Sequence, residues 1–357
     1  LFRSTIGPIT FFRLLQRYGG AQGALKALPH VSRSIGRSAP IRLADRRAAE
    51  EELAAVEALG ARLIAAGEPD YPRMLMPLPD RPPLLCVKGH VSLFERPAVA
   101  IVGARNASGV GRKMARQLSA DLGAAGVVVV SGLARGIDGA AHAASLDTGA
   151  IAVVAGGIDV IYPPEHDDLT REIAERGALV SENALGRQPT ARDFPRRNRL
   201  ISGLSRGVVV VEAAAKSGTL ITARFALEQG REVFAVPGSP LDPRCQGANR
   251  LIRDGAILVE TADDILQALA QQNRGVREGK SEMADWEAGA DGEIDPTETA
   301  RLRETVREAL SFTPLHRDEI LREIDAPAGL VIDALIDLVL AGDAEEHSGG
   351  RFALKTD

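Results

Sequence analysis

Several arginines and one aromatic residue stand together directly before an apolar run in the stretch "FPRRNRLISGLSRGVVVVEA". Guanidinium groups contact phosphates in a bidentate manner, and an exposed aromatic ring stacks a nucleobase for about 1–3 kcal/mol. Because a stacked base has to be unpaired, this combination favours single-stranded nucleic acid over duplex. For any one arginine, pairing with a carboxylate at the end of a sheet is an open alternative, as is a core position for the phenylalanine. The residues concerned are Phe194, Arg196, Arg197, Arg199 and Arg206.

Three short turns rich in glycine and serine precede predicted helices and could bind anions. They lie in "IVGARNASGVG", "SGLARGIDGAAH" and "SGTLITARFALEQG". Such turns let the backbone approach a phosphate, and the free N–H groups at a helix N-terminus favour negative charge. Arg105 and Arg135 lie in the first two loops, where a guanidinium is well placed for a phosphodiester. The residues expected to form these anion loops are Gly103, Ser108, Gly109, Gly132, Ser217, Gly218 and Thr219.

An enzyme that uses the same loops is the alternative to a binding protein. The first loop is not GxGxxG and the second strand ends in Ser131 instead of an acidic residue, so a dinucleotide site is not expected. Ser131, Asp138 and His142 could suggest hydrolysis, but no G-x-S-x-G elbow is present and Asp138 suits a helix cap. Glu212 is the remaining general-base candidate beside the third turn. We expect no catalytic residue, no metal and no cofactor, with a nucleotide-processing enzyme of the phosphoribohydrolase type as the alternative.

The elements that must position these residues follow a regular order from Pro97 onward. "AVAIVG", "VVVVSG", "AIAVVAGG", "GALVSE", "GVVVVEA", "EVFAVPG" and "GAILVE" predict buried strands, separated by helical stretches. Continuous apolar strands between helices indicate a mostly parallel sheet that is covered on both faces. In such a sheet, ligands bind at the carboxyl ends of the strands, where the loops described above lie. The predicted fold class is α/β, with a doubly wound, mostly parallel sheet.

Smaller modules are predicted on either side of this sheet. Residues 1–65 indicate a small helical module of the SAM or helix-hairpin-helix kind, and the sheet domain is placed at 66–270. Residues 271–299 are polar and aperiodic, which predicts a flexible linker. Residues 300–357 suggest a winged-helix-like module, and the only charged side chains in its third helix are Asp333 and Asp337. Because a helix without basic residues should not enter a major groove, we expect this module to contact protein.

Charge and composition limit the kinds of function. The net charge is −5, which argues against indiscriminate coating of nucleic acid, whereas residues 187–206 hold six arginines and one acidic residue. Any polyanion site is therefore a local patch. No apolar run approaches the ~20 residues of a membrane span, so no membrane contact is expected. Cys86 and Cys245 lie far apart without metal-ligand spacing, which favours the reduced cytoplasm.

The motifs together resemble those of the DNA-processing protein A (DprA/Smf) family. "AIVGARNASGVG", "SGLARGIDGAAH", "FPRRNRLISGLS", "VVEAAAKSGTLITARFALEQGREVFAVPG" and "QGANRLIRDGA" occur in the order and spacing typical of the family, over roughly residues 70–265. The resemblance implies an extended Rossmann-like domain that binds single-stranded DNA. It also implies a homodimer that passes the strand to the recombinase RecA and protects incoming DNA during natural transformation. It carries a DNA-binding role onto Arg105, Phe194, Arg197 and Arg199, while Arg196 fills a variable slot.

Overall fold

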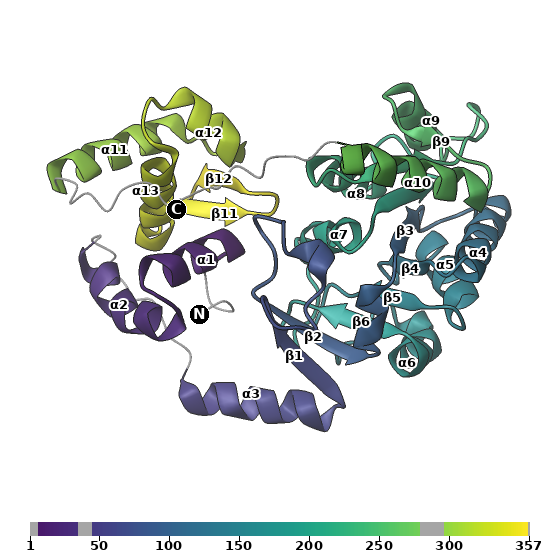
Figure 1. Cartoon of the computed structure of the whole chain (residues 1–357), viewed down its shortest axis with the longest axis horizontal. Helices are drawn as coiled ribbons and strands as arrows, with labels where there is room; N and C mark the ends of the chain where they lie inside the picture. Colours follow the sequence, from purple (N-terminus) through teal and green to yellow (C-terminus); the bar gives the residue numbers. More distant parts are fainter. Residues whose placement is uncertain (1–5, 35–44, 279–295, 356–357) are drawn as a thin grey trace. The chain divides into compact units, whose positions relative to one another are not determined.

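The computed structural model describes residues 6–34, 45–278 and 296–355, which belong to two compact units. Unit 1 combines the two ends of the chain, residues 1–49 and 281–357, with the short segment 79–83. Unit 2 comprises residues 50–78 and 84–280 and contains the predicted sheet domain (Figure 1). The candidate site lies entirely in unit 2.

Unit 2 is built on a nine-stranded sheet with the order β1-β2-β6-β5-β4-β3-β7-β8-β9. Strands β3 to β9 pair with one another in parallel. The pairs β1–β2 and β2–β6 are antiparallel. This confirms the predicted α/β class and the mostly parallel sheet. The strands are β1 (Ala61–Ala65), β2 (Leu84–Gly89), β3 (Ala98–Gly103), β4 (Val128–Ser131), β5 (Ala150–Val153), β6 (Ala178–Ser181), β7 (Gly207–Val211), β8 (Glu232–Ala235) and β9 (Ile257–Leu258).

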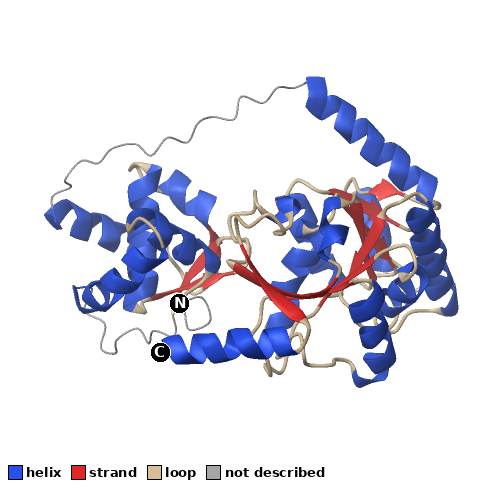
Figure 2. Cartoon of the chain, turned by 60° about the horizontal axis from the view of Figure 1, so that its bottom comes forward, coloured by secondary structure: helices blue, strands red, loops and turns tan. Residues whose placement is uncertain are grey.

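Helices cover both faces of this sheet because successive strand residues point to opposite sides. Val208 and Val210 of β7 pack into one core with α7 (Asp193–Gly203), α8 (Thr219–Glu228) and α9 (Gln246–Arg253). Val209 and Val211 pack into the other core with α4 (Gly109–Ala124), α5 (Ile137–Ser145) and α10 (Ala262–Glu278). Helix α6 (Asp167–Arg176) extends that second layer over β5 and β6. Figure 2 shows the twisted strands of unit 2 between these helical layers.

The chain order creates a switch point in the sheet. After β3 the chain adds β4, β5 and β6 on one side and then returns to add β7 on the other side of β3. The loops that leave β3 and β7 therefore diverge, and ligands of open α/β sheets bind in the crevice between such loops. Short 3-10 turns, η1 (Arg73–Leu75), η2 (Val91–Glu95) and η3 (Pro164–His166), complete the unit.

Unit 1 contains the winged-helix arrangement predicted for the C-terminal module. Its elements are α11 (Pro296–Ala309), β10 (Leu315–His316), α12 (Arg317–Glu323), α13 (Ala328–Ala341), β11 (Ala344–His347) and β12 (Arg351–Leu354), with the sheet order β10-β12-β11. The N-terminal helices α1 (Pro8–Arg17) and α2 (Ala21–Ser34) share an apolar core with α13 through Leu14, Leu28 and Ile336. Helix α3 (Arg46–Ala58) follows in the chain and continues into unit 2.

The acidic residues of α13 are engaged within unit 1. Arg13 donates through Nε and Nη2 to Asp333, at 2.9 and 3.0 Å, and Arg17 pairs with Asp337 at 3.3 Å. Glu346 accepts hydrogen bonds from the backbone N–H groups of residues 9 and 10 at the start of α1. The protein contacts expected of the acidic helix are thus made, at least at these two positions, with the N-terminal helices of the same chain.

The predicted linker differs from the structure at both of its ends. Residues 271–278 continue α10 and residues 296–299 begin α11, whereas the rest of 271–299 lies outside the described residues. Sequence polarity misled the prediction because an amphipathic helix with few apolar residues has the composition of a linker. No helix in the described parts of the chain combines the length and hydropathy needed to cross a membrane.

Candidate nucleic-acid interface

Two adjacent pockets open at the carboxyl edge of the sheet, where the sequence placed the site. The first, which we call the switch-point pocket, has a volume of about 700 Å³ and is lined by the loops after β3 and β7, one face of α7 and the start of α8. The second, which we call the β4–β5 pocket, has a volume of about 360 Å³ and is lined by the loops after those two strands. Arg105, Asn106, Ala134, Phe194 and Arg197 contribute to both pockets.

Phe194 forms part of the wall between the two pockets, together with a tyrosine and an arginine. Its ring is half-buried and lies 5.3 Å from the ring of Tyr162, at an angle of 53° between the planes. The guanidinium of Arg105 lies 5.2 Å from the centre of the same ring, which is a cation–π distance. Arg105 itself is exposed and, within the described ranges, forms no ion pair. A partly exposed aromatic cluster beside an uncompensated cation suits a base and its phosphate.

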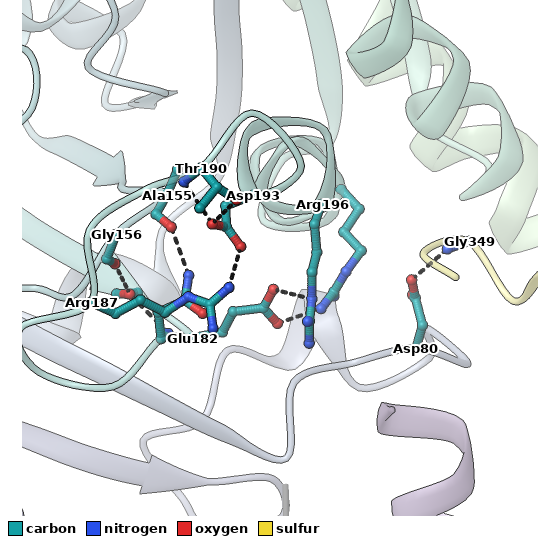
Figure 3. Close-up of polar contacts among 12 residues, drawn as sticks. Asp80, Ala155, Gly156, Glu182, Arg187, Thr190, Asp193, Arg196 and Gly349 are labelled. Atoms are coloured by element: carbon teal, nitrogen blue, oxygen red, sulfur yellow. Dashed lines mark hydrogen bonds and ion pairs between the residues drawn. The ribbon is translucent and has the colours of Figure 1, made fainter. Parts of the chain in front are cut away.

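The segment that carries Phe194 is helix α7, an element that the sequence analysis does not predict. Thr190 stands just before the helix and donates its N–H and hydroxyl to Asp193, the first helical residue, at 2.8 and 2.7 Å, and Arg187 donates to the same carboxylate (Figure 3). Thr-x-x-Asp followed by Pro195 is a helix-start pattern that the sequence does contain. Phe194 and Asn198 are one helical turn apart, so both lie on the same face of α7 and line the switch-point pocket.

Arg197 is buried and serves as an internal tie. It is 5% exposed, and its Nη1 donates to the backbone oxygen of Gly132, at 2.6 Å, and to that of Val153. Burial lowers the pKa of Arg197 to about 10, against the opposing effect of the Asp138 carboxylate. Arg197 is expected from the sequence to contact a phosphate directly, and this expectation is corrected. Its guanidinium links the ends of β4 and β5 and is a buried part of the lining of both pockets.

Arg199 and Arg196 share one carboxylate. Arg199 is 1% exposed and its Nη2 lies 2.5 Å from Glu182, a buried residue just after β6. Arg196 reaches the other oxygen of Glu182 at 3.0 Å (Figure 3) while 40% of its side chain stays exposed. For Arg199 the sequence expectation of a DNA contact is wrong, because helix α7 turns the side chain away from both pockets into an ion pair. For Arg199, the alternative of pairing with a carboxylate at the end of the sheet is therefore the one that the structure shows, with Glu182 as that carboxylate.

The two other arginines named from the sequence lie in different surroundings. Arg135 is 62% exposed, lines the β4–β5 pocket and pairs with Glu165, so only part of its charge remains for a ligand. Arg206 donates its backbone N–H to Ala98, the first residue of β3, which places it at the amino edge of the sheet. Proximity in sequence to Arg199 did not bring Arg206 to the same site.

The first anion loop is filled by the protein's own carboxylate. Glu212 accepts hydrogen bonds from the backbone N–H of Ser108, at 2.8 Å, and from the Ser108 hydroxyl, at the N-terminus of α4. A Cβ added at Gly111 would lie 2.5 Å from the Glu212 carboxyl carbon, so the side chain occupies the place of an anion. The predicted phosphate contact at Ser108 is thereby corrected, whereas the contact predicted at Gly109 stays a prediction. Gly103 serves packing, since a Cβ there would lie 1.9 Å from the backbone oxygen of Val211.

The second anion loop is satisfied in the same way. Asp138 accepts from the N–H groups of Gly132 and Ala134, at 3.1 and 3.3 Å, and burial raises the pKa of its carboxyl against these hydrogen bonds and Arg197. Gly132 is therefore not free to bind an anion. Ser131 donates its hydroxyl to the backbone oxygen of a β3 residue at 2.6 Å instead of to His142. Burial lowers the pKa of His142 to about 3. No side-chain hydrogen bond among the described residues joins His142 to Ser131 or Asp138, so the three side chains do not have the geometry of a triad.

No carboxylate fills the third anion loop, although the N–H of Thr219 donates to the Ser217 hydroxyl at 3.2 Å and the next two N–H groups donate to backbone oxygens of the same turn. Thr219 donates its hydroxyl to the backbone oxygen of Gly103 at 3.0 Å, which fixes the start of α8 beside the end of β3. A Cβ added at Gly218 would meet nothing within 4 Å, and the first turn of α8 holds no acidic residue. Ser217, Gly218 and Thr219 line the switch-point pocket together with the exposed Lys216, for which the described residues provide no ion-pair partner. Helix dipole and lysine thus favour negative charge at one place.

Two residues of this surface were missed by the sequence reading. Lys216 stands directly before the Ser217-Gly218-Thr219 turn, and a cation next to a helix-start turn is a recognisable signal for anion binding. Tyr162 lies in the loop "GGIDVIYPPEH" and contacts Phe194 only through the fold. No pattern in the sequence links these two aromatic residues.

Comparison with known proteins agrees with this arrangement. The model of the family described as "DNA recombination-mediator protein A" matches residues 62–270, the "DprA-like N-terminal HHH domain" matches residues 1–55, and the "DprA winged helix domain" matches residues 293–350. Protein Smf of Escherichia coli is 46% identical over 227 residues, which cover 63% of this chain and 61% of that protein. Protein Smf of Synechocystis is 34% identical over 316 residues, 82% of this chain and 79% of that protein.

Solved structures give the same relationship. The X-ray structure of DNA processing protein A from Streptococcus pneumoniae matches with a TM-score of 0.66 and 36% identity, covering 73% of this chain and 93% of that one. A structure that concerns the single-stranded DNA binding mode of DNA processing protein A from Helicobacter pylori matches with a TM-score of 0.55 and 28% identity, covering 59% and 96%. With a family model over more than half of its length, this chain belongs to the DNA recombination-mediator protein A (DprA/Smf) family.

Proposed function

We propose that the chain binds single-stranded DNA at the switch-point pocket and acts as a non-catalytic recombination mediator. The observation that carries the proposal is that the start of α8, which has no acidic residue in its first turn, lines the same pocket as Lys216, Arg105 and Phe194. Membership of the family and the single-stranded DNA binding described for the Helicobacter pylori protein support it.

Each group has a distinct task in this proposal. The positive end of the α8 dipole and the ammonium of Lys216 attract a phosphate, and the exposed guanidinium of Arg105 neutralises a neighbouring one. Phe194, supported by Tyr162, offers its half-exposed ring to a base. These contacts read no base edge, so binding is expected to depend little on sequence. A duplex has its bases stacked inside and cannot use the ring.

The family resemblance extends the proposal to partners. A homodimer in the cytoplasm that protects incoming DNA during natural transformation and passes it to the RecA recombinase is the role that we propose for the whole protein. A nucleotide-processing enzyme is less well supported, because the carboxylate proposed as its general base, Glu212, is occupied by Ser108 and blocks the first phosphate loop.

Fluorescence titration with a labelled oligothymidylate, repeated over a range of salt, tests the proposal. Single-strand affinity should fall with salt by a slope of about −0.7 per phosphate contact. Lys216→Ala and Arg105→Ala should each weaken binding and reduce that slope by roughly one contact, about 0.7. Arg116→Ala, which removes an exposed arginine of α4 outside both pockets, is the matched control and should change neither quantity.

Competition with unlabelled nucleic acid distinguishes the alternatives. Unlabelled single strand should displace the probe, and duplex of the same sequence should displace it poorly. Equal displacement by duplex, or a salt slope that Lys216→Ala and Arg105→Ala leave intact, would contradict the proposed site. Turnover of nucleoside monophosphates by the wild type would support the enzymatic alternative.

A further inference from the structure

Arg206 lines a separate pocket at the amino edge of the sheet, opposite the edge that carries the proposed DNA site. This amino-edge pocket has a volume of about 480 Å³ and lies entirely in unit 2. Its walls come from the segment around η1, from η2 and from the starts of β3 and β7. A volume of this size falls in the range of small-molecule sites, and the function proposed above makes no use of it.

Positive charge exceeds negative charge in this pocket. Arg73, Arg96 and Arg206 line it against two carboxylates, Asp70 and Glu95. The charge of Asp70 is already paired with Arg62, which lies outside the pocket lining, at 2.6 Å. Arg73 and Arg206 have no ion-pair partner in the described parts of the chain. Arg96 likewise forms no ion pair among the described residues, so three guanidinium groups face Glu95 as the one carboxylate of the lining that is not already paired.

An aromatic side chain stands in the same pocket, and its frame is held in place. Phe94 of η2 is half-buried and packs against the core that contains Val208 and Val210. The backbone of Met74, in η1, accepts a hydrogen bond of 2.8 Å from Arg231, and Arg96 donates to the backbone oxygen of Gly126 at 3.0 Å. The pocket is therefore formed by anchored segments. Arg206 is half-buried among these walls and forms no ion pair with a carboxylate of the described residues. Removing a cation partly from water costs free energy unless an anion accompanies it.

We propose that the amino-edge pocket is a second binding site for a nucleotide unit, in which Arg206 and Arg73 hold the phosphate and Phe94 contacts the base. Arginine pairs and an aromatic face are the combination that binds phosphate and base together. The proposal rests on the function proposed above in one respect: the nucleotide unit is a further part of the same single strand. A free mononucleotide shares the chemistry, and the experiment separates the two sources.

The spacing of the two pockets determines the length of strand that can reach both. Ala98 lines the amino-edge pocket and Gly103 lines the switch-point pocket, and the five residue steps of β3 between them span about 17 Å. At the 3.4 Å per nucleotide of a stacked strand, a direct path already needs about five nucleotides. A path around the surface needs more. A strand of about three nucleotides spans only about 10 Å at this rise and should therefore occupy one pocket, whereas one of about thirty nucleotides can occupy both.

The test compares short and long oligothymidylates on the full chain. Arg206→Gln should lower affinity for the long strand by about fivefold to tenfold, the effect of one charge-assisted contact, and leave affinity for the short strand unchanged. Arg206→Lys should recover part of the loss, because the charge remains. Arg73→Gln repeats the test at an exposed side chain whose removal leaves the fold intact, and Arg116→Ala is the control.

A thermal-shift measurement with thymidine monophosphate identifies the source of the nucleotide. Stabilisation by the mononucleotide that Arg206→Gln and Arg73→Gln remove, with long-strand affinity unchanged, would support the pocket as a mononucleotide site and reject the longer DNA path. If neither variant changes long-strand affinity or the mononucleotide shift, the proposal is overturned. Failure of the short strand to bind the wild type would refute the switch-point site instead, which keeps the two proposals distinguishable.

Discussion

Replacement of Arg199 should cost stability and leave DNA affinity intact, although this residue stands in the arginine-rich segment beside Arg196 and Arg197. Its guanidinium is 1% exposed and pairs with the buried carboxylate of Glu182. Removing one partner of a buried pair costs about 3–5 kcal/mol, and because Arg196 still contacts Glu182 at 3.0 Å, the loss is expected near the lower end of this range. For a domain of this size, each kcal/mol shifts the melting temperature by about 2–4 °C. Arg199→Ala should therefore lower the melting temperature of unit 2 by an amount near the lower end of about 6–20 °C.

Arg196→Ala is the matched control because it removes the other arginine from the same carboxylate. Arg196 is 40% exposed, and pairs of that kind contribute at most about 1 kcal/mol. The double variant Arg199→Met with Glu182→Leu should recover most of the lost stability, since a buried ion pair can be replaced by apolar packing at little cost.

The measurements are thermal melting followed by circular dichroism, and oligothymidylate titration well below the melting transition. Affinity of Arg199→Ala for the single strand should stay within about twofold of wild type, because the side chain faces neither pocket. An unchanged melting temperature together with a loss of affinity like that of Arg105→Ala would refute the structural assignment of Arg199.

Three further changes have expected outcomes. Phe194→Trp should retain affinity for the single strand, whereas Phe194→Leu should lose about 1–3 kcal/mol of binding free energy in the same titration. The salt slope of the Leu variant should be unaltered, because stacking releases no counterions. Wild-type binding by the Leu variant would exclude stacking. The pKa of His142 is about 3 in the folded state against an ordinary 6.5, so the unfolded chain takes up the proton first, and stability is complete above pH 6.5 and lost as pH falls toward 3. Urea unfolding should show a loss of roughly 1 kcal/mol per pH unit in this window, which His142→Leu should flatten; an equally steep profile in that variant would assign the loss to other groups. Glu212→Ala should empty the start of α4 and make the melting temperature rise with phosphate concentration more than in wild type; an identical response would mean that the carboxylate does not occupy an anion site.

The framework of the site could be predicted from sequence because its signals are local. The apolar runs of β3 to β8 have the composition of strands buried on both faces, and the turns between strand and helix mark the carboxyl edge of the sheet. Three of the predicted groups, Arg105, Phe194 and the Ser217-Gly218-Thr219 turn, do meet in one pocket. Their meeting follows from the strand order, which places β3 next to β7.

Helix α7 shows where local signals were present but not used. The Thr190-x-x-Asp193 cap and Pro195 indicate a helix start, and a helical period separates Phe194 and Asn198 from Arg196 and Arg199. Without the helix, all the arginines of the segment appear equivalent. With it, one face lines the switch-point pocket and another contacts Glu182.

The sequence by itself determined the strands, the turns and the presence of more arginines than a buried strand needs, because each of these depends on neighbouring residues alone. Only the tertiary structure decided which cations and which turns remain for a ligand. Glu212 contacts Ser108 across 104 residues and Glu182 contacts Arg199 across 17 residues, and pairing between groups on different elements is created by folding. Lys216 and the start of α8 keep their charge for a ligand because the fold brings no carboxylate to them among the described residues.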